Sequence, residues 1–414
     1  MKNLKELQSA RALRSAVNVD IPVSGKPRRR NGYQSIQSGS GHSLWAAEDW
    51  SFALMVYENS LTRFELVDGF ESLTPLMQVV SSNRWRYCEM NNSIYASNGL
   101  TTARIDRLGA LQSWGVDSPG GQPALSATTG WGLDAGRYQV AITAVAPSGE
   151  ESGTGRAAVV AVSADGGITL STIPQTAPDH AINIYCSPPN GEALYHVARI
   201  PYGITSFTID RSHIAQMGKL LDTQFCDKIP ASSFLCSYRG RIYFAIGDTL
   251  YYTLALRYGQ FRIHQTYFRF PHRITGVAAV DDGIYVGTQR GAYFLGGNDP
   301  KDMQQLPVDA FGVVENTLQD TRGVTFGLKL PPNEKAAVWW SNNGVLMRGG
   351  ASGVITPITK GRLALPKFSS GSLLLREQDQ LQQLISVFRG GDNGSPLAAR
   401  DAITLKVIRN GVAV

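Results

Sequence analysis

The chain has 414 residues, of which 43% are hydrophobic and 17% charged, with a formal net charge of +6. This apolar content suffices for a large core and excludes wholesale disorder, while the basic balance permits association with polyanions without requiring it. The 43 glycines and 20 prolines are spread along the chain, which favours many short turns and therefore an all-β fold.

The N-terminal region combines a helical pattern with a basic run. Residues 2–17 place apolar side chains at helical spacing among basic ones, which predicts a short amphipathic helix. Neither this segment nor any later window has the apolar stretch of a secretory signal or a membrane span, so we expect no export and no membrane insertion. Arg28, Arg29 and Arg30 form the densest basic run. We expect this basic loop to be solvated, the alternative being a nucleic-acid contact.

From residue 41 onward, short apolar runs recur as a turn, a strand and a second turn. The clearest copies are residues 92–99, 240–247 and 282–288, and weaker ones begin near residues 41, 337 and 371. Most copies lie about 35–55 residues apart, and a period near 45 is typical of β-propeller blades. The spacing predicts a propeller of about six blades. We also expect part of residues 15–45 to pair with, or pack beside, strands after residue 360, because an unclosed ring exposes strand edges.

One interval of about 150 residues breaks the period, which indicates an insertion. Residues 136–152 place Tyr138, Val140 and Ile142 on one strand face before a Pro-Ser-Gly turn, and further short strand patterns follow. Six or seven strands in about 90 residues are typical of a fibronectin-type-III-like sandwich. The predicted domains are an N-terminal segment with the first blades, the inserted sandwich, and the remaining blades with the C-terminal strands, at residues 1–117, 118–212 and 213–414.

Two strings of the propeller region are distinctive, Tyr-Arg-Gly-Arg-Ile-Tyr-Phe-Ala-Ile-Gly at residues 238–247 and Asp-Asp-Gly-Ile-Tyr-Val-Gly-Thr at 281–288. Together with residues 221–225 and 292–297, they resemble a group of bacteriophage virion proteins that combine a propeller with an inserted sandwich. Val-Asn-Val-Asp at residues 17–20, followed by the basic turn near residues 27–33, is similar to the opening of tail nozzle and packaged-DNA stabilisation proteins of short-tailed phages.

This resemblance implies a non-enzymatic structural component of a phage tail, a ring-forming nozzle or tail hub subunit that lines or closes the DNA ejection channel. The implied partners are further copies of the chain in a hexameric ring, other tail or portal-adaptor proteins, double-stranded DNA in transit, and a host surface receptor. The implied location is the virion, after assembly in the host bacterial cytoplasm. Two alternatives stay open: a tail-tip propeller that recognises a host surface glycan or pilus, and a glycan hydrolase on a propeller scaffold.

The enzyme-like strings of the sequence each favour a structural explanation. Residues 163–170, Ser-Ala-Asp-Gly-Gly-Ile-Thr-Leu, resemble the Asp box of sialidase propellers, but Leu170 stands in the place of its Trp and the string occurs once, so we expect a turn. The adjacent acids at 150–151 and 281–282 lie in turn contexts. We expect them to be solvated rather than to act as an acid–base pair.

The metal-binding residue types are also poorly arranged for chemistry. Four cysteines and six histidines show no zinc spacing, and we expect the thiols to be reduced. Aspartate- and glycine-rich loops at 296–302 and 390–394 lack the alternating acids of a dedicated calcium loop and favour turns. The sequence therefore predicts no catalytic residue, no metal and no cofactor.

Aromatic residues fall into two groups. The tryptophans within or beside the repeat strands, Trp45, Trp50, Trp85, Trp339 and Trp340, are expected to fill the space between blades. A second group interleaves aromatics with arginines and is the candidate subunit interface, because these residue types are enriched in interface cores. Its residues are Arg257, Tyr258, Phe261, Arg262, Tyr267, Phe268, Arg269, Phe270 and Arg273. Arg262 and Arg269 face opposite ways on an extended strand, which favours a subunit contact over a DNA contact.

Overall fold

The computed structural model describes residues 19–20, 28–29, 38–46, 51–67, 70–322, 334–361, 363, 365–378, 381–390 and 402–407. The expected helix over residues 2–17, Arg30 and Trp50 lie outside these residues. The described part is all-β apart from the short helix α2 (Arg211–Ala215) and one 3-10 turn (Ala351–Gly353). None of its helices has the length and apolar character needed to cross a membrane.

Most strands belong to antiparallel meanders, each built from strands that follow one another in the chain. Two of these sheets precede the insertion, and their strands are β3 (Gly41–Ala46), β4 (Ala53–Tyr57), β5 (Ser60–Val67) and β6 (Phe70–Gln78), then β7 (Arg86–Met90), β8 (Ser93–Ser97), β9 (Thr102–Asp106) and β10 (Leu111–Gln112). The first sheet after it contains β19 (Phe234–Tyr238), β20 (Arg241–Ile246), β21 (Thr249–Tyr252) and β23 (Tyr267–Arg269).

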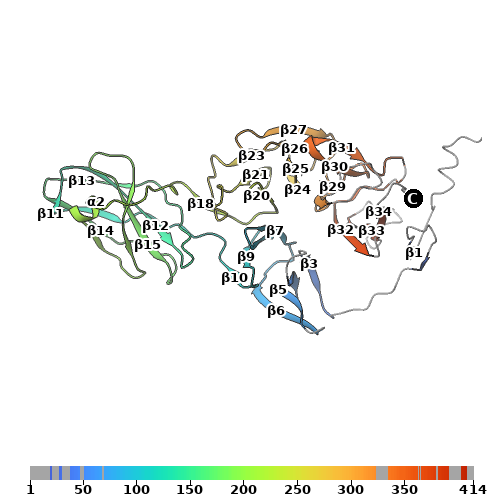
Figure 1. Cartoon of the computed structure of the whole chain (residues 1–414), viewed down its shortest axis with the longest axis horizontal. Helices are drawn as coiled ribbons and strands as arrows, with labels where there is room; N and C mark the ends of the chain where they lie inside the picture. The colour runs from blue at the N-terminus through green and yellow to red at the C-terminus, as the bar shows by residue number, and fades with distance from the viewer. Residues whose placement is uncertain are drawn as a thin grey trace, which may run out of the picture.

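Three more sheets complete the set. Their strands are β24 (Ile274–Val280), β25 (Gly283–Thr288), β26 (Gly291–Gly296) and β27 (Gln304–Asp309); β28 (Gln319–Arg322), β29 (Lys335–Trp340), β30 (Leu346–Gly349) and β31 (Ile355–Pro357); and β32 (Ser370–Gln378), β33 (Leu381–Arg389) and β34 (Ala402–Val407). Viewed down the shortest axis, the sheets follow one another around a common centre with the first strand of each sheet innermost (Figure 1). This arrangement is a β-propeller.

The recurrent pairs of large residues in the second strand of each sheet are explained by the packing between blades. Successive side chains of a strand point to opposite faces, and both faces of a propeller blade are covered. Ile94 accordingly packs in the core shared with the preceding sheet, whereas Tyr95 packs in the core shared with the following one. Ile284 and Tyr285 divide in the same way between the cores on either side of the β24–β27 sheet.

The expected core role of the tryptophans holds for Trp85, Trp339 and Trp340, each of which is 1% exposed. Trp339 and Trp340 repeat the two-sided pattern, because Trp339 packs toward Tyr285 and Trp340 toward Phe388. Trp45 is half-buried and packs at the edge of the first inter-blade core.

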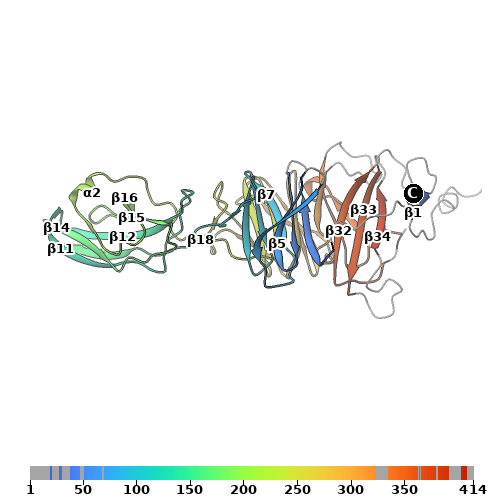
Figure 2. The ribbon, with the colours of Figure 1, turned by 90° about the horizontal axis from the view of Figure 1, so that it is seen from below.

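The first and last sheets of the ring lie side by side in both views (Figures 1 and 2). Among the described residues they do not exchange strands, since β3 pairs with β4 and β32 pairs with β33. Contacts to the last sheet come instead from side chains of the connection that leads from the first sheet to the second. The Arg84 guanidinium, in the connection before β7, donates to the Gly371 carbonyl of β32 at 3.0 Å and also bonds Ser372.

The insertion between β10 and β18 (Asp227–Lys228) is a two-sheet sandwich with its own core. One sheet has the order β11-β14-β17 and the other the order β13-β12-β15-β16. The strand bounds are β11 (Ala124–Leu133), β12 (Gly136–Val145), β13 (Ala158–Val162), β14 (Gly166–Ser171), β15 (Ala181–Cys186), β16 (Tyr195–Ile200) and β17 (Phe207–Ile209). Seen edge-on, the sandwich lies beside the rim of the propeller and in its plane (Figure 2).

The junction between sandwich and propeller is built from buried side chains. The Trp114 indole N–H donates to the Tyr258 carbonyl at 2.7 Å, and its ring lies 5.1 Å from that of Tyr95 in the propeller. On the sandwich side, the Glu151 carbonyl accepts a hydrogen bond from the side chain of Gln260, next to Phe261 in β22 (Gln260–Phe261). Because Val116, two residues after Trp114, is buried in the sandwich core, the connection is anchored in both domains and fixes the sandwich to the propeller rim.

Candidate ligand site

The predicted subunit interface does not form one surface, and two of its aromatic residues belong to the core. Phe261 is 3% exposed and packs against Phe244 and Tyr251, and Phe270 is 2% exposed. The chain itself covers both rings, so they are not available to another subunit. For Phe261 and Phe270 the prediction was wrong. Phe261 lies in β22, which pairs with β18, and Phe270 packs against Tyr293 in the core between the third and fourth sheets.

The remaining residues of that segment are divided among three places. Tyr258 packs beside Tyr95 against a core of the propeller. Next to it, Arg257 forms an ion pair with Asp222 and Arg262 donates to the Asp222 carbonyl at 3.2 Å. The rim strand β23 carries Tyr267 and Arg269, which are exposed, and Phe268, which is half-buried. Arg273 faces a pocket on the propeller.

Two residues of the predicted basic loop are described. Arg28 and Arg29 form β2 (Arg28–Arg29), which pairs with β1 (Val19–Asp20), and Arg29 is exposed. They lie in a separate two-stranded sheet rather than in a blade.

The acidic pair Glu150–Glu151 departs from the expected solvated turn. The Glu151 side chain is only 9% exposed and accepts hydrogen bonds from Asn183 at 2.9 Å and Tyr185 at 2.6 Å, with further bonds from Thr143 and Lys219. Burial raises the pKa of this carboxyl, but the bonds from its four partners outweigh that effect and hold the pKa below its ordinary value. It therefore ties the turn after β12 to strand β15.

The other acid-bearing turns hold backbone N–H groups, and Asp282 is half-buried rather than fully solvated as expected. The Asp281 carboxylate accepts from the Lys335 backbone N–H at 3.0 Å, and the Asp282 carboxylate accepts from that of Ser352 at 2.7 Å. The carboxylate of Asp165, in the string that resembles an Asp box, accepts from the Gly132 N–H at 3.1 Å in a turn. Within the described ranges no group of three or more His, Cys, Asp or Glu residues is arranged to hold a metal ion.

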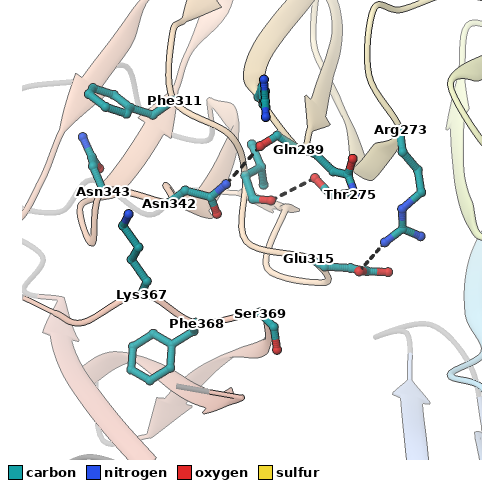
Figure 3. Close-up of a pocket in the computed structure, with 12 residues that line it drawn as sticks. Arg273, Thr275, Gln289, Phe311, Glu315, Asn342, Asn343, Lys367, Phe368 and Ser369 are labelled. Atoms are coloured by element: carbon teal, nitrogen blue, oxygen red, sulfur yellow. Dashed lines mark hydrogen bonds and ion pairs between the residues drawn. The ribbon is translucent and has the colours of Figure 1, made fainter. Parts of the chain in front are cut away.

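A pocket of about 590 Å³ opens where three sheets of the propeller meet. Its walls come from the start of β24, the turn between β25 and β26, the segment before β28, the turn between β29 and β30, and the segment before β32 (Figure 3). The lining residues are Arg273, Thr275, Gln289, Arg290, Phe311, Val313, Glu315, Asn342, Asn343, Lys367, Phe368 and Ser369.

The charges of the pocket are unbalanced. It holds three cationic side chains and a single carboxylate. That carboxylate, Glu315, forms an ion pair with Arg273 at 2.6 Å. Arg290 and Lys367 are exposed and have no carboxylate partner in the part of the chain that the structure describes. Figure 3 shows Lys367 pointing toward Asn342 and Asn343. The pocket therefore offers positive charge beside amide groups.

The sequence singled out only Arg273 among these residues. Phe311, Arg290 and Lys367 are isolated residues in loops of different sheets, and no motif or spacing connects them. The one feature that they share in the sequence is their place in a turn or connection next to a repeat strand. Only the packing of three consecutive sheets side by side brings these turns together.

Comparison with known proteins gives no family. No protein-family model matches the chain, and no curated protein matches it. Among solved structures, it is similar to BBS1N in complex with ARL6DN, with 10% identity and a TM-score of 0.39 over 92% of this chain and 97% of that one.

Two other propellers show the same level of likeness. The Dos1 propeller has 9% identity and a TM-score of 0.36 over 90% of this chain and 79% of that one. The Pan2 WD40 domain of Neurospora crassa has 9% identity and a TM-score of 0.34 over 87% and 92%. At these values the likeness carries no argument about function, and the propeller assignment rests on the sheets and inter-blade cores.

Proposed function

We propose that this chain is a non-enzymatic structural component of a bacteriophage tail, a nozzle or hub subunit that assembles into a hexameric ring around the DNA ejection channel of the virion. The sequence strings that resemble tail proteins suggest it, and the anchored sandwich supports it. A rigid arm that lies in the plane of a disc can reach the next disc of a ring, because its direction is set by the junction rather than by a flexible linker. We take the disc to have six blades and the sandwich to be fibronectin-III-like.

The single observation that carries the proposal is the burial at the junction. Trp114 is buried in the propeller core beside Tyr95, and Val116, two residues later, is buried in the sandwich core. Arg104 of the propeller lies 3.7 Å from Glu150 of the sandwich. A connection anchored in both cores has little freedom to bend, unlike the exposed and flexible linkers that usually join domains. The arm is therefore held in one orientation, as assembly through it requires.

DNA passage is proposed through the hole of the ring of subunits and not through the propeller itself. Arg86 of β7 reaches the side chain of Asn316, before β28, and Arg84 reaches β32. The sheets of these partners are not neighbours of the β7 sheet in the ring, so the contacts cross its centre (Figure 1). Side chains occupy the axis of the disc.

Replacement of residues 118–212 by a short Gly/Ser linker tests the proposal. The inter-blade cores do not include the sandwich core, so the shortened chain should keep a cooperative melting transition. It should form rings less readily than the full chain when both are imaged by electron microscopy at equal concentration. Rings of unchanged stability would contradict assembly through the arm, and loss of all cooperative melting would contradict the domain division.

A second candidate function is a tail-tip propeller that recognises a host surface glycan, and the pocket favours it. Small-ligand sites are concave, measure about 300–1,000 Å³ and combine apolar walls with a few polar groups. The pocket meets this description with Phe311, Val313 and Phe368 beside amides and cations. Adsorption to host cells, measured with the purified chain and with a variant altered in the pocket, tests this candidate. Equal adsorption by both would contradict it.

A further inference from the structure

We propose that the pocket lined by Arg290, Phe311 and Lys367 binds an acidic sugar residue, one that carries a carboxylate on a pyranose ring. The inference rests on the second candidate function and names the chemistry of its ligand. It is carried by the charge, the polar groups and the rigidity of the pocket.

The excess positive charge of the pocket favours binding of an anionic ligand. Glu315 neutralises Arg273 through a contact of 2.6 Å, which leaves Arg290 and Lys367 as the cations without a carboxylate partner among the described residues. A guanidinium binds a carboxylate through two parallel hydrogen bonds, and an ammonium adds a point charge. The pair therefore suits one carboxylate better than a neutral group.

The neutral groups of the pocket suit the hydroxyls and the ring of a sugar. Gln289 and Asn343 are exposed amides that can both donate and accept. The Asn342 amide donates to the Gln289 carbonyl at 3.1 Å, which leaves its oxygen as an acceptor. Phe311 is 51% exposed, so one wall presents an aromatic face on which the apolar side of a pyranose can pack.

The backbone around these groups is fixed before any ligand arrives. The Phe311 N–H donates to the Asp309 carboxylate at 3.0 Å, and the Val313 N–H donates to the Thr288 carbonyl at 2.9 Å. Below them, Phe368 stacks on Phe388 with ring centroids 4.2 Å apart. Groups held in place lose less entropy when a ligand binds.

The size of the site separates a sugar from a nucleic acid. An open pocket of about 590 Å³ has room for one small ligand, whereas duplex DNA needs a row of cations along its phosphates. The two cations without a partner lie in one pocket and not along a stripe. DNA is therefore the alternative that the experiment must exclude.

The test measures binding of 3′-sialyllactose and α-1,4-trigalacturonate, each beside its methyl ester, to the full chain by titration calorimetry at low salt. The ester keeps the ring and the hydroxyls and removes the charge. We expect the acids to bind and the esters to bind at least about tenfold more weakly, since hydrogen bonds to charged groups contribute more than neutral ones. Lys367→Gln and Arg290→Gln should each weaken binding of the acid about tenfold, and Phe311→Ala should weaken acid and ester alike.

Arg156→Gln is the matched control, because Arg156 is an exposed arginine of the sandwich far from the pocket in sequence. It should leave binding unchanged. Equal binding of acids and esters at the pocket would overturn the acidic ligand while leaving glycan recognition standing. Absence of binding by every sugar would overturn both. Binding of a short DNA duplex that is lost in Lys367→Gln and Arg290→Gln, without sugar binding, would also overturn the inference.

Discussion

The carboxylate of Glu151 offers the sharpest test of how the sandwich is stabilised, through the substitution Glu151→Ala. This carboxylate is 9% exposed and receives hydrogen bonds from Thr143, Asn183, Tyr185 and Lys219. Lys219 is largely exposed and adds little. The substitution leaves the buried donors of the other three side chains without their acceptor, at a cost of about 1–3 kcal/mol for each donor that stays unsatisfied.

Partial rearrangement of the hydroxyls reduces that sum, so we expect a loss of about 3–4 kcal/mol, in the range measured when one partner of a buried ionic network is removed. In a domain of about 90 residues each kcal/mol shifts the melting temperature by about 4–8 °C. Differential scanning calorimetry of the full chain should therefore show the sandwich transition lowered by at least about 12 °C, with the propeller transition little changed.

Glu192→Ala provides the control, since Glu192 is an exposed glutamate of the same domain. It should shift neither transition. A Glu151→Ala transition within about 2 °C of the wild type would show that the sandwich does not depend on this carboxylate, because a shift that small is well under 1 kcal/mol for a domain of this size.

The remaining predictions concern the pH response, the core and the thiols. The pKa of Glu151 is lower in the folded chain than its ordinary value of 4.5, so the ionised carboxylate stabilises the sandwich fully above pH 4.5, and this contribution is lost as the pH falls through the folded pKa. The melting temperature of the sandwich should therefore drop steeply on acidification in the wild type and less steeply in Glu151→Gln. Phe261→Ser should destabilise the propeller by about 3–5 kcal/mol in chemical unfolding, whereas Tyr267→Ser, on the exposed rim, should leave stability within about 0.5 kcal/mol. Arg86→Gln should lower the propeller's melting temperature, measured by calorimetry, because the shorter side chain loses the contact across the centre of the ring. A thiol reagent should label the native chain very slowly and fully only after denaturation, because all four cysteines are buried, namely Cys88, Cys186, Cys226 and Cys236.

The repeat of the propeller could be predicted because its physical cause acts within a few residues. A blade strand buried on both faces needs two adjacent large side chains between small turns, as Ile94–Tyr95 and Ile284–Tyr285 show. The break in the period then located the insertion. These signals are local, so a single sequence contains them.

The fate of Phe261 and Glu151 could not be predicted, because distant residues decide it. In the sequence, Phe261 belongs to an aromatic and basic run that is expected to be exposed. In the structure, β22 pairs with β18 and Phe244 covers the Phe261 ring. In the sequence, Glu151 is one of two adjacent acids in a turn. In the structure, strand β15 places Asn183 and Tyr185 within hydrogen-bond distance of its carboxylate. Burial that depends on long-range pairing leaves no trace in the local sequence.

The pocket could not be predicted from the sequence either, because its residues come from distant parts of the chain. Arg290 and Lys367 are separated by most of two sheets in the chain and meet only where three consecutive sheets of the propeller pack side by side. Neither belongs to a motif. A sequence search for adjacent chemical groups finds acids in turns instead, such as the pair at 281–282, whose carboxylates hold backbone N–H groups.

The most direct test of the central claim is the mass of the purified full chain in solution, measured by light scattering after size-exclusion chromatography over a range of micromolar concentrations. We expect a closed ring of six copies of the 44.9 kDa chain, each burying more than about 1,000 Å² with its neighbour. Rings seen by electron microscopy should have the sandwich at the contact between discs. A monomer at every concentration, and in the assembled virion, would contradict the account.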